Sequence, residues 1–392
     1  MLIQYNMTDK LCAFPWHMYS IDTGFGWWRS CPRADYKPLN DLNFFNHGEL
    51  VDQRQSLRNN IEHPTCWRCW DAEKDKSKSY RQVLKMDYPH KRVDQDFVKI
   101  PELLEIKFSN LCNLKCIFCS SNCSSLWERD DPIDSSRLGK YRGDEVAKKI
   151  LEFADTNYKE IKMFQMFGGE PVIVKEFGQL FDLILSKPIS DGKKTISFST
   201  NMYYGEAYRK RFEDRIEAVL DKGHDLFMRF SIDGMHKQGE YLRTGMEWNK
   251  FEDNLDSFME RFHDHPTIGR MRCNIALNIT NLVYLDKIMQ FIDDKGYINV
   301  QPHYNYVHKP EHFYLKSYGT RLNRAIDILE KQDFRKFDSY KCHVIELTKS
   351  MSSLQPNLEK IKEGKNWLDK YDVIAGNKFL ELFPLNEFMY ND

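Results

Sequence analysis

The feature that most constrains the fold is an alternation of short apolar runs with longer amphipathic segments, which begins near Pro101. Each apolar run has the length and residue types of a β-strand, and each intervening segment has the apolar spacing of a helix. Strands that alternate with helices predict a parallel sheet with helices packed against it. Six strands are expected, within the stretches LLEIKFSN, IKMFQMFGGE, TISFSTN, FMRFSIDG, MRCNIALNIT and INVQPHYNYV.

Six strand–helix units are fewer than the eight of a complete TIM barrel. The predicted fold is therefore α/β, a partial (βα)6 TIM-type barrel, and we assign it to residues 96–310. Residues 1–95 contain glycine, proline, many aromatic residues and four cysteines, which predicts a small irregular module held together by cysteine ligands. Residues 311–392 predict a mostly helical C-terminal extension.

Charge and hydropathy bear on the compartment and the partners. The formal net charge is −1, from 57 basic and 58 acidic residues, so it indicates neither a nucleic-acid nor a membrane partner. The basic segment from Lys74 to Arg92 could hold a phosphate chain, but its composition also suits a solvated helix. No apolar run approaches the roughly 20 residues that span a bilayer. The opening residues are too polar for a signal peptide. We therefore expect a cytoplasmic protein with reduced thiols.

Four of the ten cysteines lie within twelve residues, in the stretch LCNLKCIFCSSNC. Cys112, Cys116 and Cys119 have the spacing C-x3-C-x2-C and follow the first predicted strand, where parallel α/β folds build their active sites. Disulfides, zinc and an iron–sulfur cluster are the alternatives, and a zinc site usually takes four ligands. Three thiolates on a [4Fe–4S] cluster leave one iron open to a substrate or cosubstrate. Cys123 is an optional fourth ligand, but we interpret it as a thiol in a following helix that is either buried or adjacent to the ligands without binding the metal.

This cysteine spacing, after the first strand of a six-unit α/β chain, resembles the radical S-adenosylmethionine (radical SAM) enzymes. The resemblance implies that the open iron chelates the amino and carboxylate groups of S-adenosylmethionine. It also implies that the reduced cluster cleaves this cofactor to methionine and a 5′-deoxyadenosyl radical, which abstracts a substrate hydrogen. Three further segments resemble family motifs and occur in the family's order: FGGEP from Phe167, STN from Ser199 and SIDG from Ser231.

The resemblance also implies which residues contact S-adenosylmethionine. Glu170 would hold the methionine ammonium, and the glycines before it would let the chain approach the ligand closely. Arg243 would bind the methionine carboxylate through both of its donor nitrogens. Ile275 and Leu277 would form an apolar wall beside the adenine. The full set of implied cofactor contacts is Phe118, Gly168, Gly169, Glu170, Thr200, Asn201, Ser231, Asp233, Arg243 and Leu277.

The N-terminal module supplies a second group of possible metal ligands, namely Cys12, Cys31, Cys66 and Cys69. One C-x2-C pair and two distant cysteines can close a four-thiolate site for zinc or for a second [4Fe–4S] cluster. The module resembles the auxiliary-cluster (SPASM or twitch) modules of radical SAM enzymes, through Pro15-Trp16 and the turn at Asp22-Thr23-Gly24. It differs in position, because such modules usually follow the core. The resemblance favours a second, fully ligated cluster that carries electrons or supports the fold.

These resemblances imply a radical SAM enzyme that modifies a peptide by oxidation or another radical reaction. Modification of a small metabolite, a sugar or a nucleotide is the alternative, and modification of a nucleic acid has no support from the net charge. A non-enzymatic, zinc-binding adaptor is a further alternative, which predicts no affinity for S-adenosylmethionine. The expected electron donor is a reductase system such as flavodoxin or ferredoxin.

Overall fold

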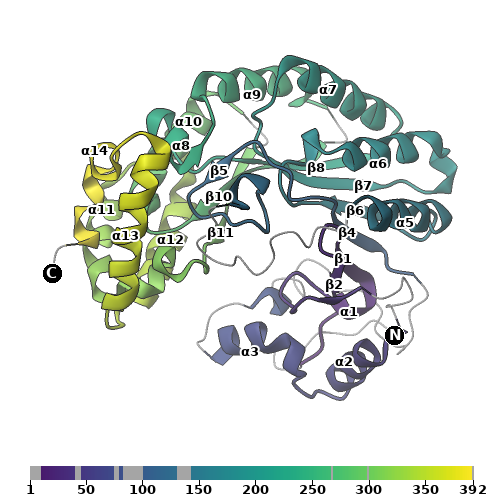
Figure 1. Cartoon of the computed structure of the whole chain (residues 1–392), viewed down its shortest axis with the longest axis horizontal. Helices are drawn as coiled ribbons and strands as arrows, with labels where there is room; N and C mark the ends of the chain where they lie inside the picture. The colour runs from purple at the N-terminus through teal and green to yellow at the C-terminus, as the bar shows by residue number, and fades with distance from the viewer. Residues whose placement is uncertain are drawn as a thin grey trace.

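The computed structural model describes residues 10–39, 46–74, 79–82, 100–129, 143–265, 268–297 and 300–390. Within these residues the chain forms a mixed α/β fold around one large sheet, with strand order β11-β10-β8-β7-β6-β4-β1-β2-β3 (Figure 1). All six predicted strands are confirmed, and each is parallel to its neighbours among the six. They are β4 (Leu103–Lys107), β6 (Met163–Met166), β7 (Thr195–Thr200), β8 (Asp225–Ser231), β10 (Ile268–Leu277) and β11 (Val300–Tyr306).

Helices connect these strands and run along the outer side of the sheet (Figure 1). Apolar residues at helical spacing explain their packing: in the first of them Ala147, Ile150 and Ala154 are fully buried against the sheet. The connecting helices are α5 (Gly143–Thr156), α6 (Lys175–Ser186), α7 (Glu206–Asp221), α8 (His236–Leu242), α9 (Trp248–Phe262) and α10 (Leu285–Asp294).

The two faces of the sheet differ in polarity. In β8, Leu226, Met228 and Phe230 are buried in the large apolar core, while the alternate residues face the other way. The same alternation turns Arg229 of β8, and Glu105 of β4, away from that core. We call this second side the inner face. A polar sheet face beside the ends of parallel strands is suited to binding a polar ligand.

The N-terminal residues extend this sheet instead of forming a separate one. Strand β1 (Met18–Asp22) pairs in parallel with β4, with Ser20 opposite Glu105. Strands β2 (Trp27–Arg29) and β3 (Lys37–Pro38) follow in antiparallel pairing, so the predicted hairpin around Asp22-Thr23-Gly24 is confirmed. The segment is also more regular than predicted, since it contains α1 (Phe14–His17), α2 (Gly48–Arg58) and α3 (Trp67–Lys74). The predicted boundary near residue 95 and most of the basic segment lie outside the described residues.

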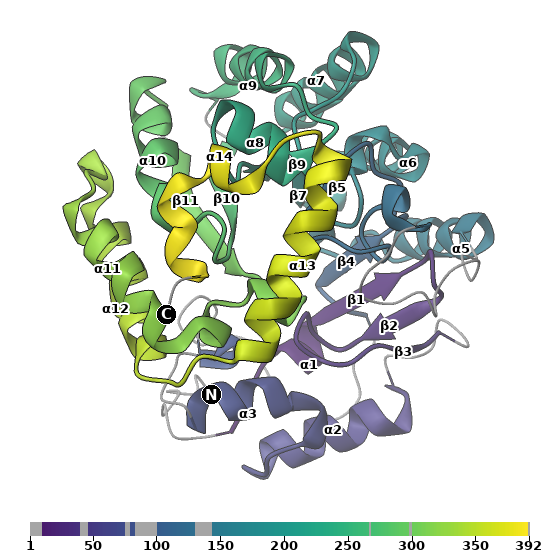
Figure 2. The same ribbon diagram turned by 60° about the vertical axis from the view of Figure 1, so that its left-hand side comes forward.

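The C-terminal extension is mostly helical, as predicted. It contains α11 (Leu322–Lys331), α12 (Asp338–Ser352), α13 (Leu358–Ala375) and α14 (Phe379–Leu382). Figure 2 shows α13 running close to the short strands β5 (Lys115–Cys116) and β9 (Arg243–Thr244). Short 3-10 helices complete the described chain, at Pro64–Cys66, Ser125–Trp127, Pro171–Ile173, Ile189–Asp191, Leu282–Tyr284, Glu311–Phe313, Leu315–Arg321, Arg335–Phe337 and Pro384–Met389. Among the described helices, none combines the length and the apolarity needed to cross a membrane.

Candidate active site at the carboxyl ends of the strands

The cysteine loop follows the carboxyl end of β4, as predicted, and backbone pairing holds it in place. Strand β5 of the loop pairs with β9, which sets Cys116 opposite Arg243. The amide of Ile117 donates to the carbonyl of Leu242 over 3.0 Å. Cys116 is buried, Cys112 and Cys119 are half-buried, and all three are free thiols. The loop therefore lies against the segment that follows β8, so two of the predicted motifs meet here.

The three thiols lie within electrostatic range of one another. Burial raises the pKa of Cys112 to about 12, with the neighbouring Cys116 raising it further. Burial also raises the pKa of Cys116 to about 11, while the Arg243 guanidinium acts to lower it. Thiols with raised pKa values become thiolates when metal ions supply the compensating charge. Among the described residues, no three His, Cys, Asp or Glu side chains are placed to hold a single metal ion. As a donor set, three neighbouring thiols beside a cation fit the larger [4Fe–4S] cluster.

Cys123 differs from its prediction. The residue is exposed and lies in a turn, not in a helix, because its amide and that of Ser124 both donate to the Ser120 carbonyl. A hydrogen bond with Cys119 lowers the pKa of Cys123 to about 6, and the charges of Lys107 and Arg29 act in the same direction. The Cys123 thiol is thus a direct neighbour of a predicted ligand. It faces the Lys107–Asp22 ion pair, whose atoms are 2.7 Å apart.

The two glycines of FGGEP serve a purpose that the sequence did not reveal. They approach the backbone of the segment between β4 and the cysteine loop closely, where a ligand contact was predicted. Gly168 has φ +130°, and a Cβ built on it would lie 2.6 Å from the Ser109 carbonyl oxygen. A Cβ on Gly169 would overlap the carbonyl of Leu111. Glycine is therefore needed here so that β6 and the segment leading to Cys112 can touch.

Gly169→Ala should consequently destabilise the fold by about 3 kcal/mol, because the Leu111 backbone must move to accommodate a methyl group. Chemical denaturation of the metal-free protein would measure the loss. Gly205→Ala is the matched control, since a Cβ there meets nothing within 4 Å and φ is −72°. We expect the control to change stability by less than about 0.5 kcal/mol. Equal effects for the two variants would contradict this account of Gly169.

Glu170 connects the ends of two strands. Its carboxylate accepts from the Asn201 amide (2.6 Å), the Thr200 hydroxyl (2.8 Å) and the Val172 amide (3.2 Å). Burial raises the pKa of Glu170 to about 7, and these hydrogen bonds together with Arg243 hold it below the value that burial alone would give. A buried carboxylate near its titration point is stabilised strongly by an added cation. Glu170 thus has the chemistry required to receive an ammonium group.

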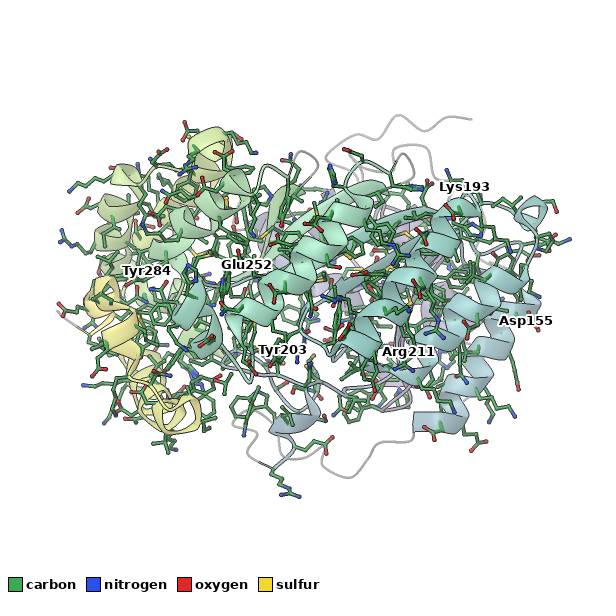
Figure 3. All side chains as sticks on the ribbon, turned by 90° about the horizontal axis from the view of Figure 1, so that it is seen from above. Asp155, Lys193, Tyr203, Arg211, Glu252 and Tyr284 are labelled. Atoms are coloured by element: carbon green, nitrogen blue, oxygen red, sulfur yellow. The ribbon has the colours of Figure 1, made fainter. Side chains whose placement is uncertain are left out.

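Asn201 joins the end of β7 to the cysteine loop. Its side-chain amide donates to the Asn113 carbonyl oxygen (2.9 Å), and Asn113 in turn donates to the backbone carbonyl of Tyr203. Tyr203 is labelled in Figure 3 and directly follows this strand end. Asn113 lies between two of the predicted cluster ligands. The structure thus brings Glu170, Thr200 and Asn201 together beside the loop, as the motif order suggested.

Asp233 and Arg243 form a buried ion pair. The Arg243 Nε donates to Asp233 Oδ2 over 2.7 Å, and the other oxygen of Asp233 accepts from the Ala276 amide over 2.6 Å. The pair joins the segment after β8 to the cysteine loop and to β10. Asp233 and Arg243 were predicted to contact different parts of one ligand, whereas in this structure they contact each other.

The remaining predicted cofactor contacts differ in how accessible their side chains are. Ser231 is half-buried at the end of β8, opposite Asn274. Phe118 is half-buried within the loop and packs on the core. Ile275 and Leu277 are both 0% exposed and belong to that core. A wall beside the adenine needs an accessible side chain, so the observed packing of Leu277 and Ile275 does not match that expectation, and the contact remains a prediction.

Three aromatic residues that the sequence did not single out form hydrogen bonds with the backbone of the cysteine loop. Trp127, Trp367 and Tyr371 donate to the carbonyls of Cys116 (3.0 Å), Ile117 (3.4 Å) and Lys115 (2.6 Å), respectively. Their rings lie side by side, with the Trp127 centroid 5.5 Å from that of Trp367 and 6.1 Å from that of Tyr371. Two of the three come from α13. Three successive loop carbonyls are thus satisfied by one aromatic group, which excludes water from them.

Tyr371→Phe should therefore cost about 1 to 2 kcal/mol, because it leaves the Lys115 carbonyl without its partner. Thermal unfolding of the metal-free protein would show the change. The matched control is Tyr340→Phe: among the described residues, the buried Tyr340 hydroxyl has no hydrogen-bond partner. Its removal should leave stability unchanged or raise it slightly. A Tyr371→Phe protein as stable as the control would show that these carbonyls do not depend on α13.

The four N-terminal cysteines also come together. Burial raises the pKa of Cys12, and Cys31, Cys66 and Cys69 each raise it further. Cys12, Cys31 and Cys66 pack in a small apolar cluster with Phe14, Trp16, Met18, Leu57 and Trp70, apart from the main core. Gln53 Nε2 lies 3.2 Å from the Cys66 sulfur. In the described part of the chain no three of these thiols are placed to hold a single metal ion. Four neighbouring thiols under aromatic cover nevertheless supply the ligand types of a four-thiolate site, and this donor set alone does not choose between zinc and iron.

Comparisons with known proteins bear on the core. Residues 106–271 match the family model described as Radical SAM superfamily. Over these residues the chain is similar to the radical SAM superfamily. The matched residues include the cysteine loop and the FGGEP, STN and SIDG segments, which are the motifs that meet in the structure. No curated protein matches the sequence.

Several solved structures are similar to parts of the chain. "Native anSMEcpe with bound AdoMet and Cp18Cys peptide" has a TM-score of 0.38 and 17% identity, and the match covers 58% of each chain. "Native anSMEcpe with bound AdoMet" has a TM-score of 0.39 and 16% identity, over 70% of this chain and 62% of the other. Streptococcus suis SuiB bound to S-adenosylmethionine has a TM-score of 0.40 and 15% identity, over 82% and 69%. The match thus spans less than two thirds of the length of the two anSMEcpe chains.

Proposed function

We propose that the protein is a radical SAM enzyme with a partial (βα)6 barrel core, which cleaves S-adenosylmethionine reductively and abstracts a hydrogen from a peptide substrate. The observation that carries this proposal is the meeting of the cysteine loop, Glu170 and Arg243 at one end of the sheet. A [4Fe–4S] cluster on Cys112, Cys116 and Cys119 would supply the electron for that cleavage. We assign the reaction to an enzyme, and not to an adaptor, because these groups converge where parallel α/β proteins do chemistry.

The chain's own residues have separate tasks in this proposal. Glu170 would receive the methionine ammonium, since its buried carboxylate gains most from a cation. Arg243 would orient the methionine carboxylate while Asp233 holds its guanidinium at a fixed angle. Asn201 and Asn113 would keep the loop in register with Glu170. Trp127, Trp367 and Tyr371 would exclude water from the loop backbone, which protects a radical from side reactions.

A peptide substrate is supported by the inner face of the sheet. Gln165 donates to Glu105 (2.8 Å), Arg229 donates to Ser197 (3.2 Å), and Asn305 donates to Asn274 (2.7 Å). Such amide, hydroxyl and guanidinium groups can exchange these bonds for bonds to the peptide groups of a substrate. The four N-terminal cysteines would hold a second [4Fe–4S] cluster that accepts an electron from the substrate. This role follows from their complete thiolate set, which leaves no open iron.

Binding of S-adenosylmethionine tests the role of Glu170. Glu170→Gln should weaken binding about tenfold, because a charged hydrogen bond to the ammonium is replaced by a neutral one. Since the wild-type pKa is about 7, ionisation rises through neutral pH and the wild-type affinity should rise from pH 6 to pH 8. The variant should show no such rise. Equilibrium dialysis on the reconstituted protein measures both effects.

Glu213→Gln is the matched control for this experiment. Glu213 is also a buried glutamate, but it lies on α7 and pairs with Ser257 and Arg261. This variant should bind S-adenosylmethionine as the wild type does at each pH. If Glu170→Gln keeps the wild-type affinity and pH profile, Glu170 does not contact the ligand.

A further inference from the structure

A cavity lies beside the N-terminal cysteines Cys31 and Cys69, away from the cysteine loop of the core. Its volume is about 450 Å³. Its walls come from β2, from the loop between β2 and β3, and from the start of α3. Its lining includes Trp27, Arg29, Arg33, Asp35, Tyr36 and Arg68.

The lining carries three guanidinium groups and one carboxylate. Asp35 already accepts from Arg68 (2.7 Å) and from the indole of Trp67 (3.1 Å). Arg29 is held by Ser20 (3.0 Å) and by the Pro32 carbonyl (2.8 Å), and its distance to Glu105 is a long 3.4 Å. Among the described residues, the Arg33 guanidinium has no hydrogen-bond or ion-pair partner and lies 5.6 Å from the centre of the Tyr80 ring, while the Arg33 carbonyl accepts from Arg68 over 2.8 Å. The cavity therefore carries a surplus of positive charge that its own carboxylate does not neutralise.

Aromatic rings form the sides of this cavity. The rings of Trp27 and Tyr36 have centroids 5.8 Å apart, and the Arg29 guanidinium lies 4.4 Å from the centre of the Tyr36 ring. The guanidinium of Arg29 is thus fixed by stacking as well as by hydrogen bonds, with its side chain only 14% exposed. A planar, preorganised guanidinium suits a planar carboxylate, and the rings suit the apolar stem that carries it.

The cavity lies at the end of the inner face that is nearest to the N-terminal cysteines. Trp27 and Arg29 lie on β2 opposite Asp22 and Ser20, and so on the inner face of the sheet. Arg33 and Arg68 lie within two residues of Cys31 and Cys69. Burial lowers the pKa of His308, just after β11, and the charges of Arg33 and Arg68 lower it further, so these arginines lie within electrostatic range of the segment that follows β11. A group bound here would lie between the inner face and the auxiliary cysteines.

We propose that this cavity binds a carboxylate of the peptide substrate, from an aspartate or glutamate side chain or from the C-terminus. The proposal rests on the peptide-modifying function proposed above and adds the charge that the substrate must carry. Substrate anchored here would have its acidic residue beside the auxiliary site. A neighbouring residue could then reach along the inner face toward the core cysteine loop.

The test uses the full-length, metal-reconstituted protein and three capped tripeptides. One is acetyl-Gly-Glu-Gly-amide, and the other two have glutamine or phosphoserine in place of its glutamate. Ligand-observed NMR titration gives a Kd for each. The glutamate peptide should bind about tenfold more tightly than the glutamine peptide. Arg33→Gln should abolish the preference for glutamate, and Arg33→Lys should retain part of it. Arg211→Gln, on the exposed face of α7 (Figure 3), should leave it unchanged.

Three results would overturn the proposal: equal affinity for the glutamate and glutamine peptides, an unaltered preference in Arg33→Gln, or binding of the phosphoserine peptide alone. Arg33→Gln removes no hydrogen bond within the described residues, so its circular dichroism and iron content should match the wild type. Measuring 5′-deoxyadenosine on the wild-type preparation separates the two claims. A glutamate preference without this product would leave the cavity assignment intact and refute the proposed reaction. Formation of the product without a glutamate preference would support the reaction and refute the cavity assignment.

Discussion

Replacing Cys112, Cys116 and Cys119 together by alanine should abolish the formation of 5′-deoxyadenosine and lower the iron content by about four atoms per chain. The reason is ligand supply: these three thiols share one loop, and each is close enough to affect the pKa of another. Without them the core would have no iron to donate an electron. Iron analysis and liquid chromatography of anaerobic reactions would measure the two losses.

Cys342→Ala provides the matched control for that variant. Cys342 is an exposed, free cysteine on α12, outside both cysteine groups. Its removal should leave the iron content and the product unchanged. If the triple variant still forms 5′-deoxyadenosine under reducing conditions, the assignment of the core ligands is wrong.

The same triple variant should remain brown and retain about four irons, held by Cys12, Cys31, Cys66 and Cys69. Those thiols converge beneath aromatic side chains, and Gln53 lies at hydrogen-bond distance from one of them. Mössbauer spectroscopy of the iron-57-loaded variant should show the quadrupole doublet of a diamagnetic [4Fe–4S]²⁺ cluster. A further variant that also lacks Cys66 and Cys69 should lose this signal.

Stoichiometric zinc without iron in the triple variant would contradict the second cluster. The module would then be a structural metal site, because four thiolates satisfy the tetrahedral preference of zinc equally well. The proposed role of the N-terminal module in electron transfer would then be refuted, while the reaction proposed for the core would not be affected.

The sequence predicted those parts of the fold that depend on local patterns. Apolar runs bounded by helical segments located all six core strands, and the motifs Gly169-Glu170 and Thr200-Asn201 follow their strands as expected. Because carboxyl ends of parallel strands meet at one edge, strand order was enough to predict that these motifs lie together. The hydrogen bonds from Thr200 and Asn201 to Glu170 confirm that they do.

What the sequence could not reveal depends on contacts between distant segments. Trp367 and Tyr371 meet the cysteine loop across separations of 250 and 256 residues, and no local pattern distinguishes them from other buried aromatic residues. The pairing of β1 with β4 is likewise non-local, so the N-terminal residues looked irregular and separate. The glycines at 168 and 169 were expected to approach a ligand, but the nearest atoms belong to Ser109 and Leu111.

The most direct measurement is an anaerobic incubation of the reconstituted wild-type protein with S-adenosylmethionine and dithionite. We predict methionine and 5′-deoxyadenosine in equal amounts, and neither product when dithionite is omitted. Protein that carries its full iron content and binds S-adenosylmethionine, but forms no 5′-deoxyadenosine on reduction, would contradict the proposal that this site is the centre of a radical SAM reaction.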